Sequence, residues 1–272
     1  MTRERPQNNI MLVGIFAVCV LFLIIASLIF KFVGVWQKSR FDGHHRFTTV
    51  ISDQTGNIVY LTVDPSQKES GKLIVKNASS LDDAFLTIPV GVDGVIVLST
   101  QLESEKSPSA LFQNALIKHN EFRFQLTFID LIRLLFSSRV VPDENTHEET
   151  ISLPFSDQEH QQIVRQMFFD KTIQNEDISI AIENASELQG VGGRLEDILT
   201  TMGAHVISVE TALQVHEQSK IVYYHEGSYT LEKLENLLGY PVEKSEDIGI
   251  SDISIIIGKD GLTNLVFRQL NE

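Results

Sequence analysis

Two patterns of apolar positions divide this sequence. Residues 10–30 form an unbroken apolar run without a single charge. At about 1.5 Å per helical residue the run spans roughly 30 Å, the thickness of the hydrocarbon core of a bilayer. Beyond residue 46, apolar residues fall in short alternating runs and helical stripes, which predict the strands and helices of a globular body. The pattern therefore predicts one transmembrane helix over 10–30, followed by an α+β part.

The apolar run is typical of a retained anchor rather than a cleaved signal peptide. Signal h-regions are about 7–15 residues long and end at a small-residue site, whereas Ala26 and Ser27 lead into three more large apolar residues. A nine-residue tail (1–9) precedes the run and a juxtamembrane segment (31–46) follows it. The cations before it are Arg3 and Arg5, and those after it are Lys31, Lys38, Arg40 and Arg46. This excess after the run favours a cytoplasmic body, but the tail is short and its free amine adds a charge, so the rule is indecisive here.

The C-terminal part, residues 177–272, has the clearest periodicity. Strict alternation over 177–182 predicts a strand, and apolar residues at helical spacing over 191–202, closed by Gly203, predict a helix. Two strands follow at 204–210 and 220–224, then a helix over 231–238 ended by Gly239 and Pro241, then a strand over 253–257. The order is βαββαβ, which predicts a two-layer domain of two helices on one face of a four-stranded sheet. A ferredoxin-like strand order is one arrangement of these elements.

The middle part, residues 47–153, is weakly punctuated and predicts a two-layer α/β domain. Strands are expected over 57–63, 72–75, 85–88 and 94–98, and helices over 109–120 and 126–136. The second helix is capped at Thr127, and Asp130 and Arg133 are expected to pair on its surface. The polar stretch Pro142–Thr150 is expected to be a surface loop or linker. A connecting helix over 154–176 is predicted to start at a capping box of Ser156 and Glu159.

Charge and composition exclude several functions. The chain has a net charge of −14, and residues 1–46 contribute +4, so the remaining body carries −18. Such a body repels nucleic acid, and we expect no nucleic-acid partner. Cys19 is the only cysteine and lies in the apolar run, which rules out an intrachain disulfide and a cysteine-based zinc site. No catalytic trio, metal-binding pattern or cofactor motif stands out, so no catalytic, metal or cofactor residues are assigned.

A small group of aromatic residues is the candidate ligand-binding site. Tyr223, Tyr224 and Tyr229 lie close together in the sequence around a predicted strand end. Aromatic faces stack on sugars and phenol hydroxyls hydrogen-bond to them. A glycine-rich turn, Gly190-Val-Gly192-Gly193, lacks the residues of a phosphate loop, and we expect it to let a helix pack close to the sheet.

The C-terminal part resembles the LytR C-terminal domain family, over residues 163–260. The resemblance is carried by a strand running into an Asn-x-Ser turn, two glycines that open a helix, an "L-x-x-x-G-x-x-V" close, a central strand and a terminal "D-x-x-x-x-x-G-x-D" strand. The residues are Ile180, Ile182, Asn184, Ser186, Gly190, Gly192, Leu199, Gly203, Val206, Ile221 to Tyr224, Asp252, Gly258 and Asp260. The resemblance implies a bacterial cell-envelope protein.

Residues 47–153 look like a degenerate relative of the LytR-CpsA-Psr domain, whose opening strand resembles Val59 to Pro65. Enzymes of that family transfer glycopolymers from polyprenyl-pyrophosphate carriers to peptidoglycan, with arginines for the pyrophosphate and aspartates for a metal. This chain has Val90 where a family member carries arginine, and only Arg123, Arg133 and Arg139 between residues 47 and 140. Anions need paired cations, so the departure implies a non-enzymatic relative.

The sequence therefore predicts a membrane-anchored envelope protein with a non-catalytic binding or interaction module. Its expected location is the cell membrane, with a single pass and an extracytoplasmic body. The membrane is one expected partner, and peptidoglycan, a cell-wall glycopolymer or another envelope protein is the other. Two alternatives remain open: a glycopolymer transferase with a degenerate active site, and a cytoplasm-facing membrane scaffold.

Overall fold

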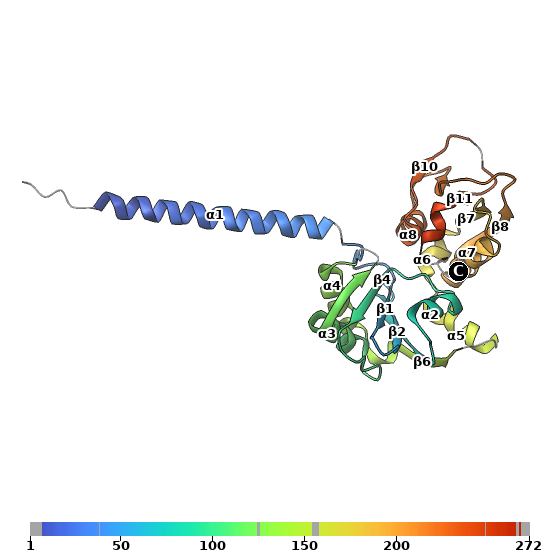
Figure 1. Ribbon diagram of the computed structural model, residues 1–272, viewed down its shortest axis with the longest axis horizontal. Coiled ribbons are helices and arrows are strands. Elements are labelled where there is room, and N and C mark those ends of the chain that lie inside the picture. Colours follow the sequence, from blue (N-terminus) through green and yellow to red (C-terminus); the bar gives the residue numbers. More distant parts are fainter. Residues whose placement is uncertain are drawn as a thin grey trace, which may run out of the picture. The chain divides into compact units, whose positions relative to one another are not determined.

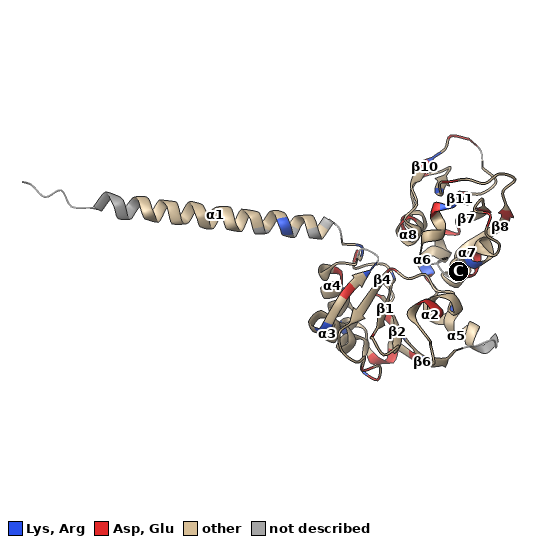
Figure 2. Ribbon diagram, viewed as in Figure 1, with Lys and Arg blue, Asp and Glu red and all other residues tan. Residues whose placement is uncertain are grey.

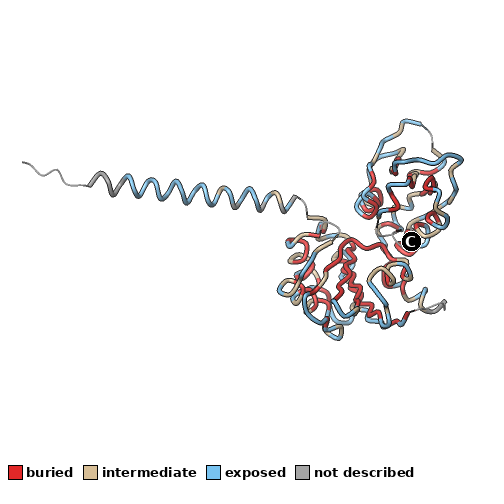
Figure 3. Tube along the Cα trace, in the orientation of Figure 1, coloured by how far each residue is buried: buried red, intermediate tan, exposed pale blue. Residues whose placement is uncertain are grey.

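The computed structural model describes residues 7–37, 39–123, 126–153, 158–247, 249–264 and 267, and divides the chain into two compact units, 1–39 and 40–272. The first unit holds one long helix, α1 (Gln7–Gln37). Its stretch Leu12–Lys31 has a mean hydropathy of 3.1 and none of it is buried (Figures 1 and 3). Length and composition make this stretch a candidate membrane span, as the apolar run predicts.

The second unit begins with a mixed six-stranded sheet, the first sheet, whose strand order is β5-β4-β1-β2-β3-β6. The strands β1, β2 and β3 form antiparallel hairpins, while β4 runs parallel to β1 and β6 runs parallel to β3. The strands are β1 (Phe47–Ser52), β2 (Ile58–Asp64), β3 (Glu69–Lys76), β4 (Gly94–Leu98), β5 (His119–Arg123) and β6 (Thr146–Ser152).

Helices cover the first sheet on both faces. One hydrophobic cluster joins it to α3 (Pro108–Lys118) and α4 (Phe128–Val140), and a second joins it to α2 (Leu81–Thr87) and α5 (Gln158–Phe168). Every residue of β1 and β2 is buried as a result (Figure 3). The expectation of a two-layer module is therefore wrong for this sheet, which is the middle of three layers.

Several expected elements of the first sheet differ in the structure. Residues 85–88 end the helix α2 rather than forming a strand, because Ser80 caps the helix by accepting a hydrogen bond from the Asp83 amide. The polar stretch Pro142–Thr150 is not a loop: a 3-10 turn (Asp143–Asn145) leads into the edge strand β6. Strands β1 and β5 were not expected from the sequence at all.

The helix α4 begins at Thr127 as predicted, in a capping box with Asp130. The carboxylate of Asp130 is fully buried rather than on the helix surface. It accepts hydrogen bonds from the Thr127 hydroxyl and amide and from the Phe41 amide, at 2.6, 2.7 and 2.9 Å. It therefore fixes the segment after the apolar helix to the body.

The connecting segment contains two helices, α5 and α6 (Lys171–Glu176). Asp170 breaks them, because its side chain caps α6 through the amides of Thr172 and Ile173. The predicted capping box cannot be placed, since Ser156 lies outside the described residues. Val164, Met167 and Phe168 pack α5 onto the first sheet.

The second sheet has five strands in the order β10-β9-β11-β7-β8. Its elements are β7 (Ser179–Asn184), α7 (Val191–Thr201), β8 (His205–Thr211), β9 (Lys220–Tyr223), α8 (Tyr229–Leu238), β10 (Val242–Lys244), β11 (Ile253–Ile257) and a 3-10 turn (Asp260–Thr263). All the predicted strands and helices of this part are present, and β10 is an addition.

The strand order is not ferredoxin-like. In that arrangement another strand separates the pair joined by a helix, whereas β7 and β8 are direct parallel neighbours. Gly203 and Gly239 both have positive φ at helix ends, as the helix-stop signals predict. Gly192 lies where an added Cβ would meet Val209 at 2.8 Å, which supports a packing role for the glycine-rich turn.

Candidate functional site

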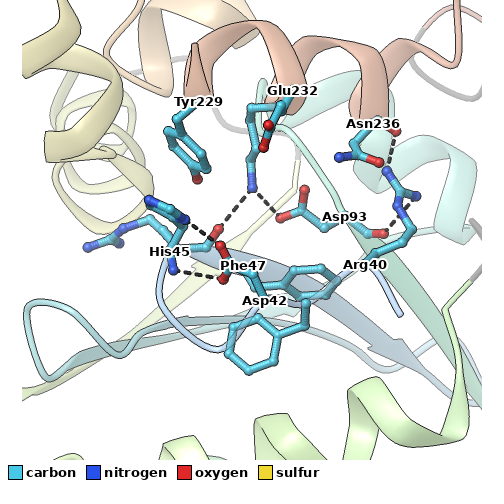
Figure 4. A pocket seen from close by; sticks show the side chains of 11 residues that line it. Arg40, Asp42, His45, Phe47, Asp93, Tyr229, Glu232 and Asn236 are labelled. Atoms are coloured by element: carbon cyan, nitrogen blue, oxygen red, sulfur yellow. Dashed lines mark hydrogen bonds and ion pairs between the residues drawn. The ribbon is translucent and has the colours of Figure 1, made fainter. Parts of the chain in front are cut away.

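The second unit contains a polar cavity of about 80 Å³. Residues from the segment 40–47, from the start of β4 and from α8 line it (Figure 4). They are Arg40, Phe41, Asp42, His45, Arg46, Phe47, Asp93, Tyr229, Glu232, Lys233 and Asn236. The cavity therefore lies where the chain enters the body and where the second sheet's helix α8 meets the first sheet.

A buried ion pair crosses this junction. The Lys233 ammonium of α8 lies 2.7 Å from the Asp93 carboxylate, and both side chains are less than a tenth exposed. Lys233 also donates to the Arg46 carbonyl at 2.9 Å, and Asp93 accepts from the Thr48 amide at 2.7 Å. Each charge thus has the additional hydrogen bonds that make burial tolerable.

Arg46 forms a second charged group at the junction. Its Nη1 donates to the Met167 carbonyl at 2.7 Å, and its guanidinium lies 3.4 Å from both Asp64 and Glu69. The contact between its Nε and Asp64 is an ion pair without hydrogen-bond geometry. Lys171 completes the group by pairing with Glu69 at 3.0 Å.

An aromatic contact also lines the cavity. The His45 ring stacks on Tyr229 with centroids 4.0 Å apart, and His45 Nδ1 contacts the Asp42 carboxylate. Burial opposes ionisation of Asp42, but the backbone amides of His45 and His44 together with the His45 ring outweigh it and lower the pKa of Asp42. Tyr229 donates to Asp170 at 2.9 Å, and burial together with this carboxylate raises the pKa of Tyr229.

This arrangement suits a rigid junction better than a reactive centre. The cavity has room for roughly five water molecules at about 15 Å³ each, and it is smaller than the pockets of about 300 Å³ or more that hold organic ligands. Among the described residues, no group of three or more His, Cys, Asp or Glu could hold a metal ion. The charged groups bind one another and backbone carbonyls.

The structure places the three predicted tyrosines in three different surroundings. Tyr223 lines a separate hollow of about 70 Å³ together with His225 and Asp252, which lie 3.1 Å apart. Tyr224 donates to Ser254 at 3.4 Å. Tyr229 belongs to the junction. The three side chains do not converge on one site.

The junction residues could not be predicted from local sequence patterns. Lys233 and Asp93 are 140 positions apart and lie in unrelated stretches, so no local spacing connects them. Arg46 was placed among the cations that flank the apolar run, although it is buried in the body. The one local indication of the junction is Asp93, an aspartate directly before the predicted strand 94–98, and this indication is weak.

The family comparison matches residues 177–260 to the LytR_C model, described as "LytR cell envelope-related transcriptional attenuator". None of the curated proteins matches the chain. Among solved structures, the Lin1025 protein from Listeria innocua aligns with 84% of this chain and 100% of its own, at 13% identity and a TM-score of 0.18, which carries no argument about the fold.

The apolar helix and the matched domain fit a membrane-anchored envelope protein and are compatible with a single-pass topology. The family match begins just before β7 and ends at the turn after β11, so it spans the second sheet and its helices α7 and α8. Residues 177–260 therefore match the LytR C-terminal domain family.

Proposed function

We propose that this chain is a single-pass membrane protein of the cell envelope whose body lies outside the cytoplasmic membrane. The body binds cell-wall polymer or another envelope protein and catalyses no reaction. The observation that carries this proposal is the LytR_C match of residues 177–260. The exposed apolar helix near the N-terminus supports the anchor.

The surroundings of the arginines support a binding role over glycopolymer transfer. Arg123 pairs with Glu121, Arg133 donates to the Asp42 carbonyl, and Arg139 contacts Gln113. A pyrophosphate needs cations that converge on one point, whereas these three side chains serve separate protein partners. Among the cations of the junction, Lys233 and Arg46 pair with carboxylates, and Arg40 donates to the Asp93 and Asn236 carbonyls.

The hollow beside Tyr223 is the ligand site we propose within the LytR_C domain. It combines a half-buried phenol ring with His225, Glu226 and Asp252. A ring face can stack on a sugar while the neighbouring polar groups accept or donate hydrogen bonds to its hydroxyls. The hollow is small, so it would hold one edge of a polymer unit rather than enclose it.

Orientation is tested with a single reporter cysteine. In a Cys19→Ala background, Leu213→Cys places a thiol at a fully exposed loop position of the LytR_C domain. A membrane-impermeant maleimide should label it in intact cells. Labelling only after permeabilisation would place the body in the cytoplasm and support the scaffold alternative instead.

Binding is tested by cosedimentation of the detergent-solubilised full chain with purified peptidoglycan. The expected result is retention that Tyr223→Ala reduces several-fold. Tyr224→Phe is the matched control, because it alters only a hydroxyl bonded to Ser254. Absence of retention, or equal loss in both variants, contradicts a glycan site at Tyr223.

A further inference from the structure

One helix of the first sheet has a second apolar face that the body does not cover. The inner side of α4 packs Leu131, Leu134 and Leu135 into the core. On its outer side Phe128, Phe136 and Val140 are 48%, 60% and 69% exposed. Ile132 lies between them, so the four residues recur every fourth position and form one stripe, here called the α4 stripe.

The neighbouring helix also carries an exposed apolar residue. Ile117 of α3 is 74% exposed, and α3 packs beside α4 (Figure 1). Beyond the C-terminal end of the stripe, Val140 and Val141 line a hollow of about 160 Å³ with Pro65 and Lys68. Contiguous exposed apolar surface of this kind marks a site of contact with a partner or a membrane.

The charges around the α4 stripe favour an anionic partner. The body as a whole carries −18, yet α3 contains no Asp or Glu, and the only acidic residue of α4, Asp130, is fully buried (Figure 2). The cations of α4 and of the end of α3 are the exposed Arg139 and the half-buried Arg133 and Lys118. Lys118 lies 3.9 Å from Glu103 in the loop before α3. A body that repels anionic surfaces elsewhere is therefore locally cationic and apolar on this face.

The covalent chain brings a membrane within reach of this face. Phe41 follows the last residue of α1, Gln37, by four residues, which span at most about 14 Å when fully extended. The amide of Phe41 donates to Asp130 in the first turn of α4, and Arg133 donates to the Asp42 carbonyl. The start of α4 is thus fixed to a segment that cannot move far from the membrane surface.

We infer that the α4 stripe is a membrane-docking surface, whose apolar residues enter the headgroup region of an anionic bilayer while Arg139 and Lys118 contact lipid phosphates. Helices with an apolar face and cationic flanks bind interfaces in this way. The inference uses the membrane span but not the side on which the body lies. Docking would hold the body against the bilayer instead of leaving it free at the end of the anchor.

The test uses the full chain reconstituted in vesicles of phosphatidylcholine with phosphatidylglycerol. An environment-sensitive fluorophore is attached at Phe136→Cys in the Cys19→Ala background, and at Leu213→Cys as the matched exposed control. The probe at position 136 should be blue-shifted, several-fold brighter and quenched by spin-labelled lipid. The control should show none of these changes. Equal behaviour of the two probes overturns the inference.

Two further arms separate lipid from other partners. Replacing phosphatidylglycerol by phosphatidylcholine, or introducing Arg139→Gln with Lys118→Gln, should reduce quenching at position 136 several-fold. Arg139 is exposed and Lys118 is half-buried, and circular dichroism should confirm an unchanged fold. A probe that is shielded equally in detergent micelles, and more so at higher protein concentration, reports a second copy on the stripe and contradicts membrane docking.

Discussion

The two sheets of this protein bury their strands in opposite ways. The first sheet lies between two helical layers, and β1 and β2 are buried along their entire length. The second sheet is covered by helices on one face, and β7 and β11 alternate between buried and half-buried residues. One sheet is an inner layer and the other is an outer layer.

This difference determines how each sheet appears in the sequence. A strand with one covered face alternates between apolar and polar residues, whereas a strand covered on both faces does not. The two threonines and the serine of β1 are buried together with its apolar residues, so the segment shows no period. Burial on both faces therefore stabilises the first sheet while hiding its strands from pattern recognition.

The largest expected effect comes from the ion pair that joins α8 to the first sheet. Lys233→Met removes the cation and leaves the Asp93 carboxylate buried with the Thr48 amide. We expect the free energy of unfolding to fall by about 3–5 kcal/mol, since an unpaired buried charge is costly. Urea denaturation followed by circular dichroism measures it.

The matched control is the double variant Lys233→Met with Asp93→Asn. The amide oxygen of the asparagine at position 93 can still accept a hydrogen bond from the Thr48 amide and carries no charge, so most of the lost stability should return. A double variant as unstable as Lys233→Met would mean that the ammonium's hydrogen bond to the Arg46 carbonyl, and not charge pairing, holds the junction.

The next largest effects come from alanine substitutions at adjacent residues of one strand in each sheet, which compare the burial of the two faces. On β3, Leu73 and Ile74 point to opposite faces and belong to different buried clusters. Alanine at either position should cost about 2–5 kcal/mol. On β11, Ile255→Ala should cost a similar amount, because Ile255 is fully buried, whereas Ile256 is half-buried on the uncovered face and its replacement should cost about 1 kcal/mol or less.

Thermal unfolding of the four variants gives the comparison. Equal losses for Ile255→Ala and Ile256→Ala would mean that something covers the outer face of the second sheet. A small loss for one of the two β3 variants would mean that one helical layer contributes little to the first sheet.

The same contrast explains how much could be predicted. Alternation at Ile178, Ile180 and Ile182 and the helix stops at Gly203 and Gly239 located the elements of the LytR_C domain almost residue by residue. Strands β1, β5 and β6 were missed because they lack a period, and residues 85–88 were misassigned because apolar β-formers outweighed the Ser80 cap.

The candidate site was less predictable than the fold. Tyr223, Tyr224 and Tyr229 are close in sequence, but Tyr223 ends β9, Tyr224 donates to Ser254, and the helix α8 carries Tyr229 to the junction. The junction itself depends on long-range pairing of Lys233 with Asp93, which no local pattern records. Sequence proximity grouped residues that the fold separates.

A smaller effect compares the start of one helix from each region. Thr127 and Asp130 cap α4 reciprocally, while Ser228 caps α8 through the Leu231 amide. Thr127→Ala should cost about 1–2 kcal/mol and Ser228→Ala about 0.5–1 kcal/mol. The larger value is expected for α4 because the fully buried Asp130 loses a donor. Hydrogen exchange of the first turn of each helix measures both, and the reverse ranking would contradict the argument.

The smallest expected effect is a pH dependence confined to the second sheet. Hydrogen bonds from the Ser179 hydroxyl and amide, at 2.6 and 2.9 Å, lower the pKa of Asp252 below its ordinary value of 3.8 and fix the start of β11 to β7. A lowered folded-state pKa stabilises the fold above about pH 4, and the contribution is lost as the pH falls through the folded-state pKa. Asp252→Asn should therefore lower the unfolding midpoint at pH 7, with a difference from the parent that shrinks on acidification.

Carboxyl chemical shifts should show Ser179→Ala raising the pKa of Asp252 toward 3.8. Because the Asp252 carboxylate is partly exposed, solvent screens its charge, and the effect should be smaller than that of the buried Lys233–Asp93 pair. A difference in unfolding midpoint that stays constant down to pH 3 would show that Asp252 acts through its shape and not its charge.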